Sequence, residues 1–190
     1  MDGIHFSLYT LRLSCFFDYR EKEEKTMTTV GIITVSDRSS RGEREDLSGP
    51  AVRDWAVVQG YSVEQERIVP DDIDKIADVL IEMSEAKISL ILTTGGTGFA
   101  PRDNTPEATR KVIEKEAPGF AEAMRYYSLK ITPHAMLSRG VSGIRKSSLI
   151  INLPGSPKAV KENLSFIEKA LPHAVDLLKN SVTDCGASEK

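Results

Sequence analysis

Short apolar runs that alternate with helix-like segments constrain the fold of this chain more than any other feature. Residues 30–36 and 88–93 form short, mostly apolar runs, as is typical of parallel strands buried on both faces of a sheet. Between them lies a segment whose apolar residues recur at helical spacing, namely Ile73, Ile76, Ala77, Leu80 and Met83. The pattern predicts an α/β fold of three layers, in which helices flank a mainly parallel sheet.

The same reading predicts the remaining strands and loops. A helix is expected at residues 49–58 and a polar loop at residues 37–48. The other expected strands comprise residues 61–69, 141–145 and 148–153. The last two strands are expected to join through a turn at Lys146 and Ser147.

Capping residues and prolines predict the helix ends. Either Asp71 or Asp72 can cap the helix that begins near residue 73, and Thr105, which a proline follows, is a typical cap. The chain is expected to end in one long helix, which Pro172 kinks or ends. The core positions of that helix are expected at Val160, Leu164, Ile167 and Leu171.

The length and composition fit one folded domain with tails. A chain of 190 residues can bury a core without disulfides, and its net charge of −3 excludes a chain-wide basic surface for nucleic acids or membranes. Cys15 and Cys185 form no Cys-x-x-Cys pair, so no zinc or redox site is expected. This cysteine usage predicts a reducing, cytoplasmic compartment.

The ends of the chain are expected to lie outside the domain, which should comprise residues 27–180. Residues 1–26 are predicted to be a disordered extension and residues 181–190 a flexible tail. The extension is a poor signal peptide, because it lacks a basic start and a small-x-small cleavage site. Met27 directly precedes the first strand, so we expect it to be the natural start and expect truncation to Met27 to preserve stability and activity.

The strand at residues 88–93 runs directly into a glycine-rich loop with the residues Thr94, Gly95, Gly96, Thr97 and Gly98. Glycines let a backbone approach a ligand closely and turn its N–H groups toward an anion, so the loop indicates a phosphate-binding site. The helix that begins near residue 105 adds a partial positive charge. The loop matches neither a P-loop nor a dinucleotide fingerprint, and a tight strand-to-helix turn is the alternative interpretation.

Acidic side chains accompany this loop. In a parallel sheet, residues 36–49, 94–105 and 153–158 should meet at the carboxyl edge, where ligands bind. Asp103 could hold Mg²⁺ against bound phosphates, or it could instead cap a helix or pair with Arg102. Asp71 follows a strand and can reach the same edge. The polar candidates of the first loop, each equally suited to a turn, are Ser36, Asp37, Asp46 and Ser48.

Residues 123–161 contain no Asp or Glu, although the whole protein is acidic. The cationic residues of this segment are Arg125, Lys130, Arg139, Arg145, Lys146, Lys158 and Lys161. The imbalance indicates a second anionic ligand, or alternatively a basic surface that pairs with acids elsewhere in the fold. Since no Ser/His/Asp or Cys/His pattern is present, covalent catalysis is not expected.

Residues 93–109 read Thr-Thr-Gly-Gly-Thr-Gly-Phe-Ala-Pro-Arg-Asp-Asn-Thr-Pro-Glu-Ala-Thr. This segment closely resembles the signature of the MogA/MoaB proteins and of the G domains of molybdenum-cofactor proteins such as gephyrin. Further segments agree with that family in order along the chain, at residues 36–38, 68–71, 118–120, 137–139 and 152–158. The resemblance covers about residues 30–178.

The resemblance implies adenylylation of molybdopterin with Mg-ATP, with release of pyrophosphate, by a homotrimer that hands its product to a molybdate-insertion protein. Asp103 matches an essential acid associated with Mg²⁺, and Asp71 a second important acid. The nucleotide site is implied at Gly95, Gly96, Thr97 and Gly98, with Ser36 and Asp46 as further candidates. The implied molybdopterin-binding residues are Ser138, Arg139, Ser142, Pro154, Gly155, Ser156 and Lys158.

Two alternatives remain open at this point. Some MoaB branches suggest a carrier that binds molybdopterin without catalysis, and the related CinA-type domains suggest another nucleotide-processing enzyme. Asn104 also departs from the family pattern, because many relatives have valine there, and this could alter the ordering of Asp103.

Overall fold

The computed structural model describes residues 27–179, so the expected extension at 1–26 and the expected tail at 181–190 lie outside the described residues. In the described part, one sheet has the strand order β2-β1-β3-β6-β5-β4. Its strands are β1 (Thr29–Val35), β2 (Ser62–Val69), β3 (Leu90–Thr94), β4 (Lys115–Glu116), β5 (Ser142–Arg145) and β6 (Ser148–Leu153). The strands β2, β1, β3 and β6 are parallel, whereas β5 and β4 pair antiparallel, which confirms the mainly parallel sheet.

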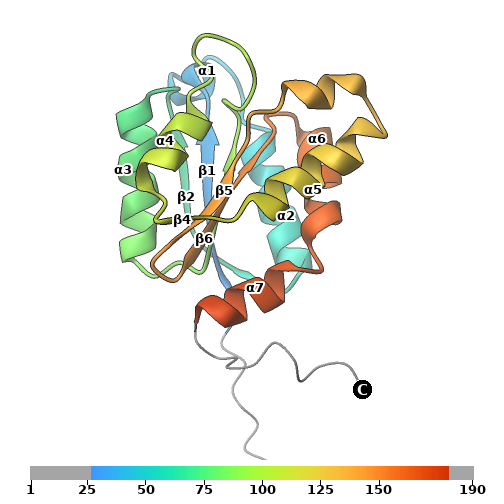
Figure 1. Ribbon diagram of the computed structural model, residues 1–190. Coiled ribbons are helices and arrows are strands. Elements are labelled where there is room, and N and C mark those ends of the chain that lie inside the picture. The colour runs from blue at the N-terminus through green and yellow to red at the C-terminus, as the bar shows by residue number, and fades with distance from the viewer. Residues whose placement is uncertain (1–26, 180–190) are drawn as a thin grey trace, which may run out of the picture.

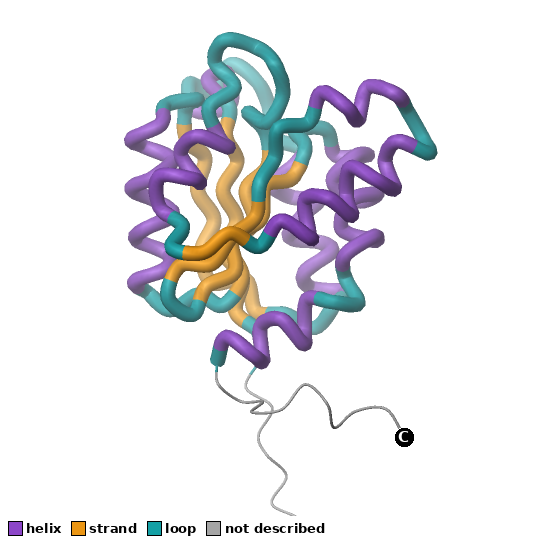
Figure 2. Tube along the Cα trace, viewed as in Figure 1, coloured by secondary structure: helices purple, strands orange, loops and turns teal. Residues whose placement is uncertain are grey.

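Helices cover both faces of this sheet (Figure 1). The helices of the described part are α1 (Asp37–Ser40), α2 (Ser48–Val58), α3 (Ile73–Glu85), α4 (Thr105–Val112), α5 (Pro118–Leu129), the 3-10 helix η1 (Pro133–Leu137), α6 (Pro157–Ile167) and α7 (Leu171–Leu178). The helices α3 and α4 pack on one face, and α2, α5, α6 and α7 pack on the other. Figure 2 shows the resulting helix–sheet–helix layers, so the predicted three-layer fold is confirmed.

Successive side chains of the central strands enter two separate cores. Ile32 and Leu92 pack with the helices of one face, whereas Ile33 and Ile91 pack with α3 and α4. None of the four side chains is more than 1% exposed. Because both faces are covered, the usual alternation of polar and apolar residues is lost, which explains the apolar runs in the sequence.

Two predicted helix boundaries are wrong. The single long final helix is instead α6 and α7, and Pro172 lies in the first turn of α7. A proline suits that position because its fixed φ is already helical and its missing N–H is not needed there. Thr105 does not cap α4, because Asn104 occupies the cap position and the buried Thr105 hydroxyl donates to the Gly95 carbonyl.

Three short elements were not predicted from the sequence. The loop predicted at residues 37–48 contains α1, whose first turn is capped by the Ser36 hydroxyl, and neither β4 nor η1 was predicted. Elements of two to five residues have too few positions to show a periodic pattern. At α3 the open choice is settled, because the Asp72 carboxylate accepts hydrogen bonds from the amides of Asp74 and Lys75.

Candidate active site

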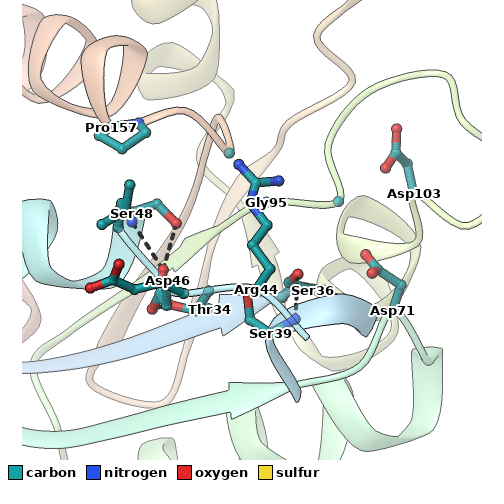
Figure 3. A pocket seen from close by; sticks show the side chains of 15 residues that line it. Thr34, Ser36, Ser39, Arg44, Asp46, Ser48, Asp71, Gly95, Asp103 and Pro157 are labelled. Carbon is teal, nitrogen blue, oxygen red and sulfur yellow. Dashed lines mark hydrogen bonds between the residues drawn. The ribbon is translucent and has the colours of Figure 1, made fainter. Parts of the chain in front are cut away.

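A polar cavity of about 230 Å³ opens at the carboxyl edge of the parallel strands (Figure 3). Its walls come from the three loops that were expected to meet there and from the segment that follows β2. The predicted site residues that line it are Ser36, Asp46, Asp71, Gly95, Gly96, Asp103 and Gly155. The structure therefore brings Asp71, Asp103 and two glycines of the glycine loop to one cavity, which we call the first cavity.

The glycine loop enters this cavity in a conformation that requires glycine. Gly95 and Gly96 have φ angles of 98° and 62°, in the region that residues with a Cβ rarely adopt. A Cβ at Gly95 would lie 2.3 Å from the Val35 carbonyl oxygen. Hydrogen bonds from the Thr105 hydroxyl to Gly95 O (2.8 Å) and from the Thr105 amide to Gly96 O (3.0 Å) hold the loop in place.

Asp71 is held by a reciprocal contact with Asp37. The Asp37 amide donates to Asp71 Oδ2 at 2.8 Å, and the Asp71 amide donates to Asp37 Oδ1 at 3.1 Å. Burial raises the pKa of Asp71 above its ordinary value, and the nearby carboxylates of Asp37 and Asp103 act in the same direction, against the hydrogen bond from the Asp37 amide. Asp37 has the opposite shift, because the Arg102 guanidinium lowers its pKa.

Asp103 lines the same end of the cavity as Asp71 (Figure 3), and its carboxylate organises its own loop. Its Oδ2 accepts a hydrogen bond from the Ala100 amide at 2.9 Å, and its amide donates to Ala100 O at 2.9 Å. The alternative interpretations of Asp103 find no support here, since Asn104 is the cap of α4 and Arg102 pairs with Asp37. The carboxylate is thus placed at the cavity without serving either structural role.

Asp46 lines the same cavity but its oxygens are already engaged. Oδ1 accepts from the Ser48 amide and the Ser48 hydroxyl (Figure 3). It also accepts from the Gly49 amide, and Oδ2 accepts from the Thr34 hydroxyl at 2.6 Å. Burial raises the pKa of Asp46, but these hydrogen bonds outweigh it and the net pKa is lowered. Asp46 therefore stays ionised and fixes the first turn of α2 against the cavity.

Arg44 is a cavity residue that was not predicted from the sequence. Its guanidinium extends into the first cavity between Asp46 and the glycine loop (Figure 3). An arginine in that place suits phosphate oxygens, because its planar donors can bind two of them at once. The sequence offers no signal for this role, because Arg44 is one charge among several in a polar loop.

A second cavity of about 270 Å³ lies on the other side of the glycine loop. Thr97, Gly98 and Pro154 line it, whereas Gly95, Gly96, Gly155 and Pro157 line the first cavity. The two loop segments touch, because the Thr94 hydroxyl donates to Pro154 O at 2.7 Å. Residues 95–98 and 154–157 therefore form a wall between two adjacent cavities, which we call the dividing wall.

The residues predicted to bind molybdopterin do not all meet in this second cavity. Ser138 and Pro154 line it, whereas the Ser142 hydroxyl is buried and donates to Ala117 O. The Ser156 hydroxyl accepts from the Ala159 amide as the cap of α6, and the side chain of Lys158 is 83% exposed near Glu162. Arg139 donates to Gly98 O and Asp103 O and pairs with Glu107.

The acid-free stretch does not form one cationic surface. Arg139 pairs with Glu107, Arg145 with Glu85 and Glu114, Lys146 with Glu85, and Lys158 with Glu162. Lys130 lies over the rings of Tyr126 and Tyr127. The alternative interpretation, in which these cations pair with acids elsewhere in the fold, therefore accounts for much of the stretch.

Residues 27–179 lack two kinds of feature. Within that range, no group of three or more His, Cys, Asp or Glu side chains could hold a metal ion. No helix of the described part is long and apolar enough to cross a membrane.

Comparisons with known proteins identify the family of this chain. A family model described as a probable molybdopterin binding domain matches residues 31–173. The chain is 49% identical over 154 residues to a molybdopterin adenylyltransferase of Helicobacter pylori, covering 78% of this chain and 86% of that protein. It is 44% identical over 170 residues to gephyrin of Dictyostelium discoideum, covering 84% of this chain but only 23% of gephyrin.

Solved structures of molybdopterin biosynthesis proteins are similar to this chain in fold as well as in sequence. The crystal structure of the molybdopterin biosynthesis enzyme MoaB from Thermus thermophilus has a TM-score of 0.77 to this chain at 48% identity, covering 81% of this chain and 98% of that one. The residues matched by the family model include both loop segments of the dividing wall and the two acids of the first cavity. This chain therefore belongs to the family of probable molybdopterin-binding domains that includes the MogA/MoaB proteins.

Proposed function

We propose that this protein transfers AMP from ATP to molybdopterin and releases pyrophosphate. The observation that carries the proposal is the pair of adjacent cavities that the dividing wall borders. A transfer between two bound anions needs two adjacent sites that hold their phosphates close together and in line. The relatives named molybdopterin adenylyltransferase support the same reaction.

ATP is assigned to the first cavity. Its lining combines Gly95 and Gly96, the first turn of α2 and the Arg44 guanidinium, which together suit a chain of phosphates. Ser36 lines the same cavity, and Asp46 fixes the α2 turn that faces it. Asp71 and Asp103 provide two carboxylates in the same cavity.

Molybdopterin is assigned to the second cavity. Apolar side chains of Met124, Ile131 and Leu137 offer surface for a flat ring system, and Ser138 and Asn163 offer polar partners. Thr97 and Gly98 bring the glycine loop to this cavity as well. A terminal phosphate that reaches past the edge of the dividing wall would meet the α-phosphate of ATP.

In this arrangement an oxygen of the molybdopterin phosphate attacks the α-phosphorus of ATP. A new P–O bond forms, the bond from the α-phosphorus to the bridging oxygen breaks, and the electron pair leaves with pyrophosphate. The protein contributes no nucleophile to this step. Arg44 and the glycine-loop backbone bind and align the phosphates.

The donor set of the first cavity fits Mg²⁺ bound through the nucleotide. Mg²⁺ in such sites takes one or two carboxylates and completes its shell with water and phosphate oxygens. Asp103 would hold the ion, and Asp71 is the second carboxylate within the same cavity. When bound, Mg²⁺ would neutralise charge on the transferring phosphates.

The test is to incubate the protein with molybdopterin and Mg-ATP and to measure adenylylated pterin and pyrophosphate. Wild-type protein should form both, and Asp103→Asn should fold normally but form neither. Binding of molybdopterin without release of pyrophosphate would instead identify the protein as a carrier. Full activity of Asp103→Asn would contradict the role of Asp103.

From the family resemblance we further propose that the protein forms a homotrimer, that it hands its product to a molybdate-insertion protein, and that it is located in the cytoplasm. Sedimentation of the purified protein tests the first directly.

A further inference from the structure

Arg139 uses the donors of its guanidinium on the protein itself. Its Nε donates to Gly98 O at 2.7 Å, and its Nη2 donates to Asp103 O. Its Nη1 pairs with Glu107, a residue of the first turn of α4. The backbone adds a fourth contact, since the Arg139 amide donates to Thr97 O at 2.9 Å.

The two carbonyls that Arg139 binds are the two ends of the loop that carries Asp103. Between Gly98 and Asp103, the hydrogen bonds of Ala100 with the Asp103 carboxylate and amide form a compact turn. The carboxylate also lies close to Gly98, because a Cβ there would be 2.9 Å from Asp103 Oδ2. The guanidinium thus closes this loop into a ring and determines where Asp103 stands relative to the glycine loop.

The chemistry of the contact requires arginine. Two carbonyls and a carboxylate converge on one planar group, and only a guanidinium offers several donors in a fixed plane. The side chains of Arg139 and Glu107 are 34% and 39% exposed, so the contact is partly shielded from solvent. A lysine has a single charged nitrogen and could not reach all three partners.

We propose that Arg139 is a positioning residue that fixes Asp103 at the first cavity, and that Glu107 holds the guanidinium in place. This proposal rests on the proposed function, and it assigns to Arg139 a role other than contact with molybdopterin. Thr97 and Gly98 line the second cavity and Asp103 lines the first. Arg139 therefore also links the walls of the two substrate sites.

The kinetic test uses Arg139→Gln and Arg139→Lys in the full chain. If Arg139 positions Asp103, kcat for AMP transfer should fall about 10²-fold, the effect of a displacement of about 1 Å, while KM for molybdopterin stays at the wild-type value. The Mg²⁺ concentration for half-maximal rate should rise. An increase in KM for molybdopterin with unchanged kcat would overturn the proposal, because it would identify Arg139 as a ligand contact.

Two further variants control for folding. Lys111 lies in the same helix as Glu107 and forms an exposed ion pair with Asp74 of α3. Lys111→Gln breaks that pair and should behave as wild type. Glu107→Gln keeps the shape of the side chain, so it should fold and lower kcat in the same direction by a smaller factor. If Arg139→Gln does not fold, an unchanged kcat in Glu107→Gln overturns the proposal.

A binding measurement separates this proposal from the proposed function. Mn²⁺ is titrated by electron paramagnetic resonance in the presence of α,β-methylene-ATP, which needs no turnover. Arg139→Gln should bind Mn²⁺ more weakly than wild type, and equal affinity would overturn the positioning role. If wild-type protein transfers no AMP in any assay, the proposed function fails, yet the Mn²⁺ titration still decides the role of Arg139.

Discussion

Asp37 and Asp71 exchange hydrogen bonds, each backbone amide donating to the carboxylate of the other, at 2.8 and 3.1 Å. The contact joins the segments after β1 and β2, two strands that lie side by side in the sheet. Arg102 neutralises Asp37 through two further hydrogen bonds, at 2.9 and 2.8 Å, from the loop that follows β3. Asp71 thus lines the first cavity, while Asp37 fixes its place.

The first prediction tests this positioning with Asp37→Asn. The amide keeps one oxygen for the Asp71 amide but loses the charge that holds Arg102, so Asp71 should be less well placed. We expect kcat for AMP transfer to fall about tenfold or more, with a cooperative fold retained. Steady-state kinetics and thermal unfolding measure both effects. Glu43→Gln, in the same loop but paired with the exposed Arg41, should match wild type, and a wild-type kcat for Asp37→Asn would contradict the prediction.

The second prediction concerns the pH dependence of stability through Asp71. Its pKa is raised in the folded state, so the folded protein binds more protons than the unfolded chain at pH values between the ordinary and the raised pKa. The contribution of Asp71 to stability is therefore complete below its ordinary pKa and is lost as the pH rises through the raised pKa. Asp71→Asn should remove this loss and be at least as stable as wild type at about pH 7.5.

Urea unfolding at about pH 5 and about pH 7.5 measures the effect. The free energy of unfolding should fall less between these pH values, or rise more, in Asp71→Asn than in wild type. AMP transfer should nevertheless decrease, as is common when an active site carries a destabilising group. The prediction would be contradicted if Asp71→Asn were less stable than wild type at the higher pH and equally stable at the lower pH.

Much of this site follows from the sequence because the topology of a parallel sheet dictates it. Asp71 and the glycine loop each follow a strand, and parallel strands end at one edge, so their meeting needs no further information. Asp103 lies five residues after the glycine loop, so the chain between them is too short for Asp103 to lie far from the cavity. The apolar runs that identify β1 and β3 therefore also locate the first cavity.

Contacts between distant side chains were harder to predict. Arg139 and Glu107 are separated by 32 residues, and no local pattern in the sequence pairs the two side chains. The hydroxyl of Thr105 similarly matches a helix cap in sequence but donates instead to a loop ten residues earlier. In each case tertiary packing selects one partner from several that local rules permit.

The third prediction concerns Asn104, the residue at the cap position of α4. Its side-chain amide donates to Asp71 O at 3.0 Å and so connects the segments of the two cavity acids. Valine cannot donate, so Asn104→Val should destabilise the protein by about 1 kcal/mol, the usual net value of one hydrogen bond. Urea unfolding measures this. Because valine keeps the backbone of Asp103, kcat should fall less than in Asp37→Asn, and a larger fall would show that Asn104 contributes more to Asp71 than Asp37 does.

The fourth prediction compares two glycines. Gly95→Ala places a methyl group 2.3 Å from the Val35 carbonyl oxygen at a φ of 98°, so either the loop or β1 must move. Gly119→Ala lies in α5 with no atom within 4 Å of the new methyl group, so it should be neutral or stabilising by up to about 1 kcal/mol.

We expect Gly95→Ala to cost about 1–3 kcal/mol of unfolding free energy from backbone strain and to weaken binding of α,β-methylene-ATP, because the displaced loop is a wall of the first cavity. Urea unfolding and calorimetric titration of the nucleotide measure the two effects in both variants. Molybdopterin binding should be affected less, since the second cavity is lined by Thr97 and Gly98 instead. Loss of molybdopterin binding with intact nucleotide binding would mean that the two ligands occupy the opposite cavities.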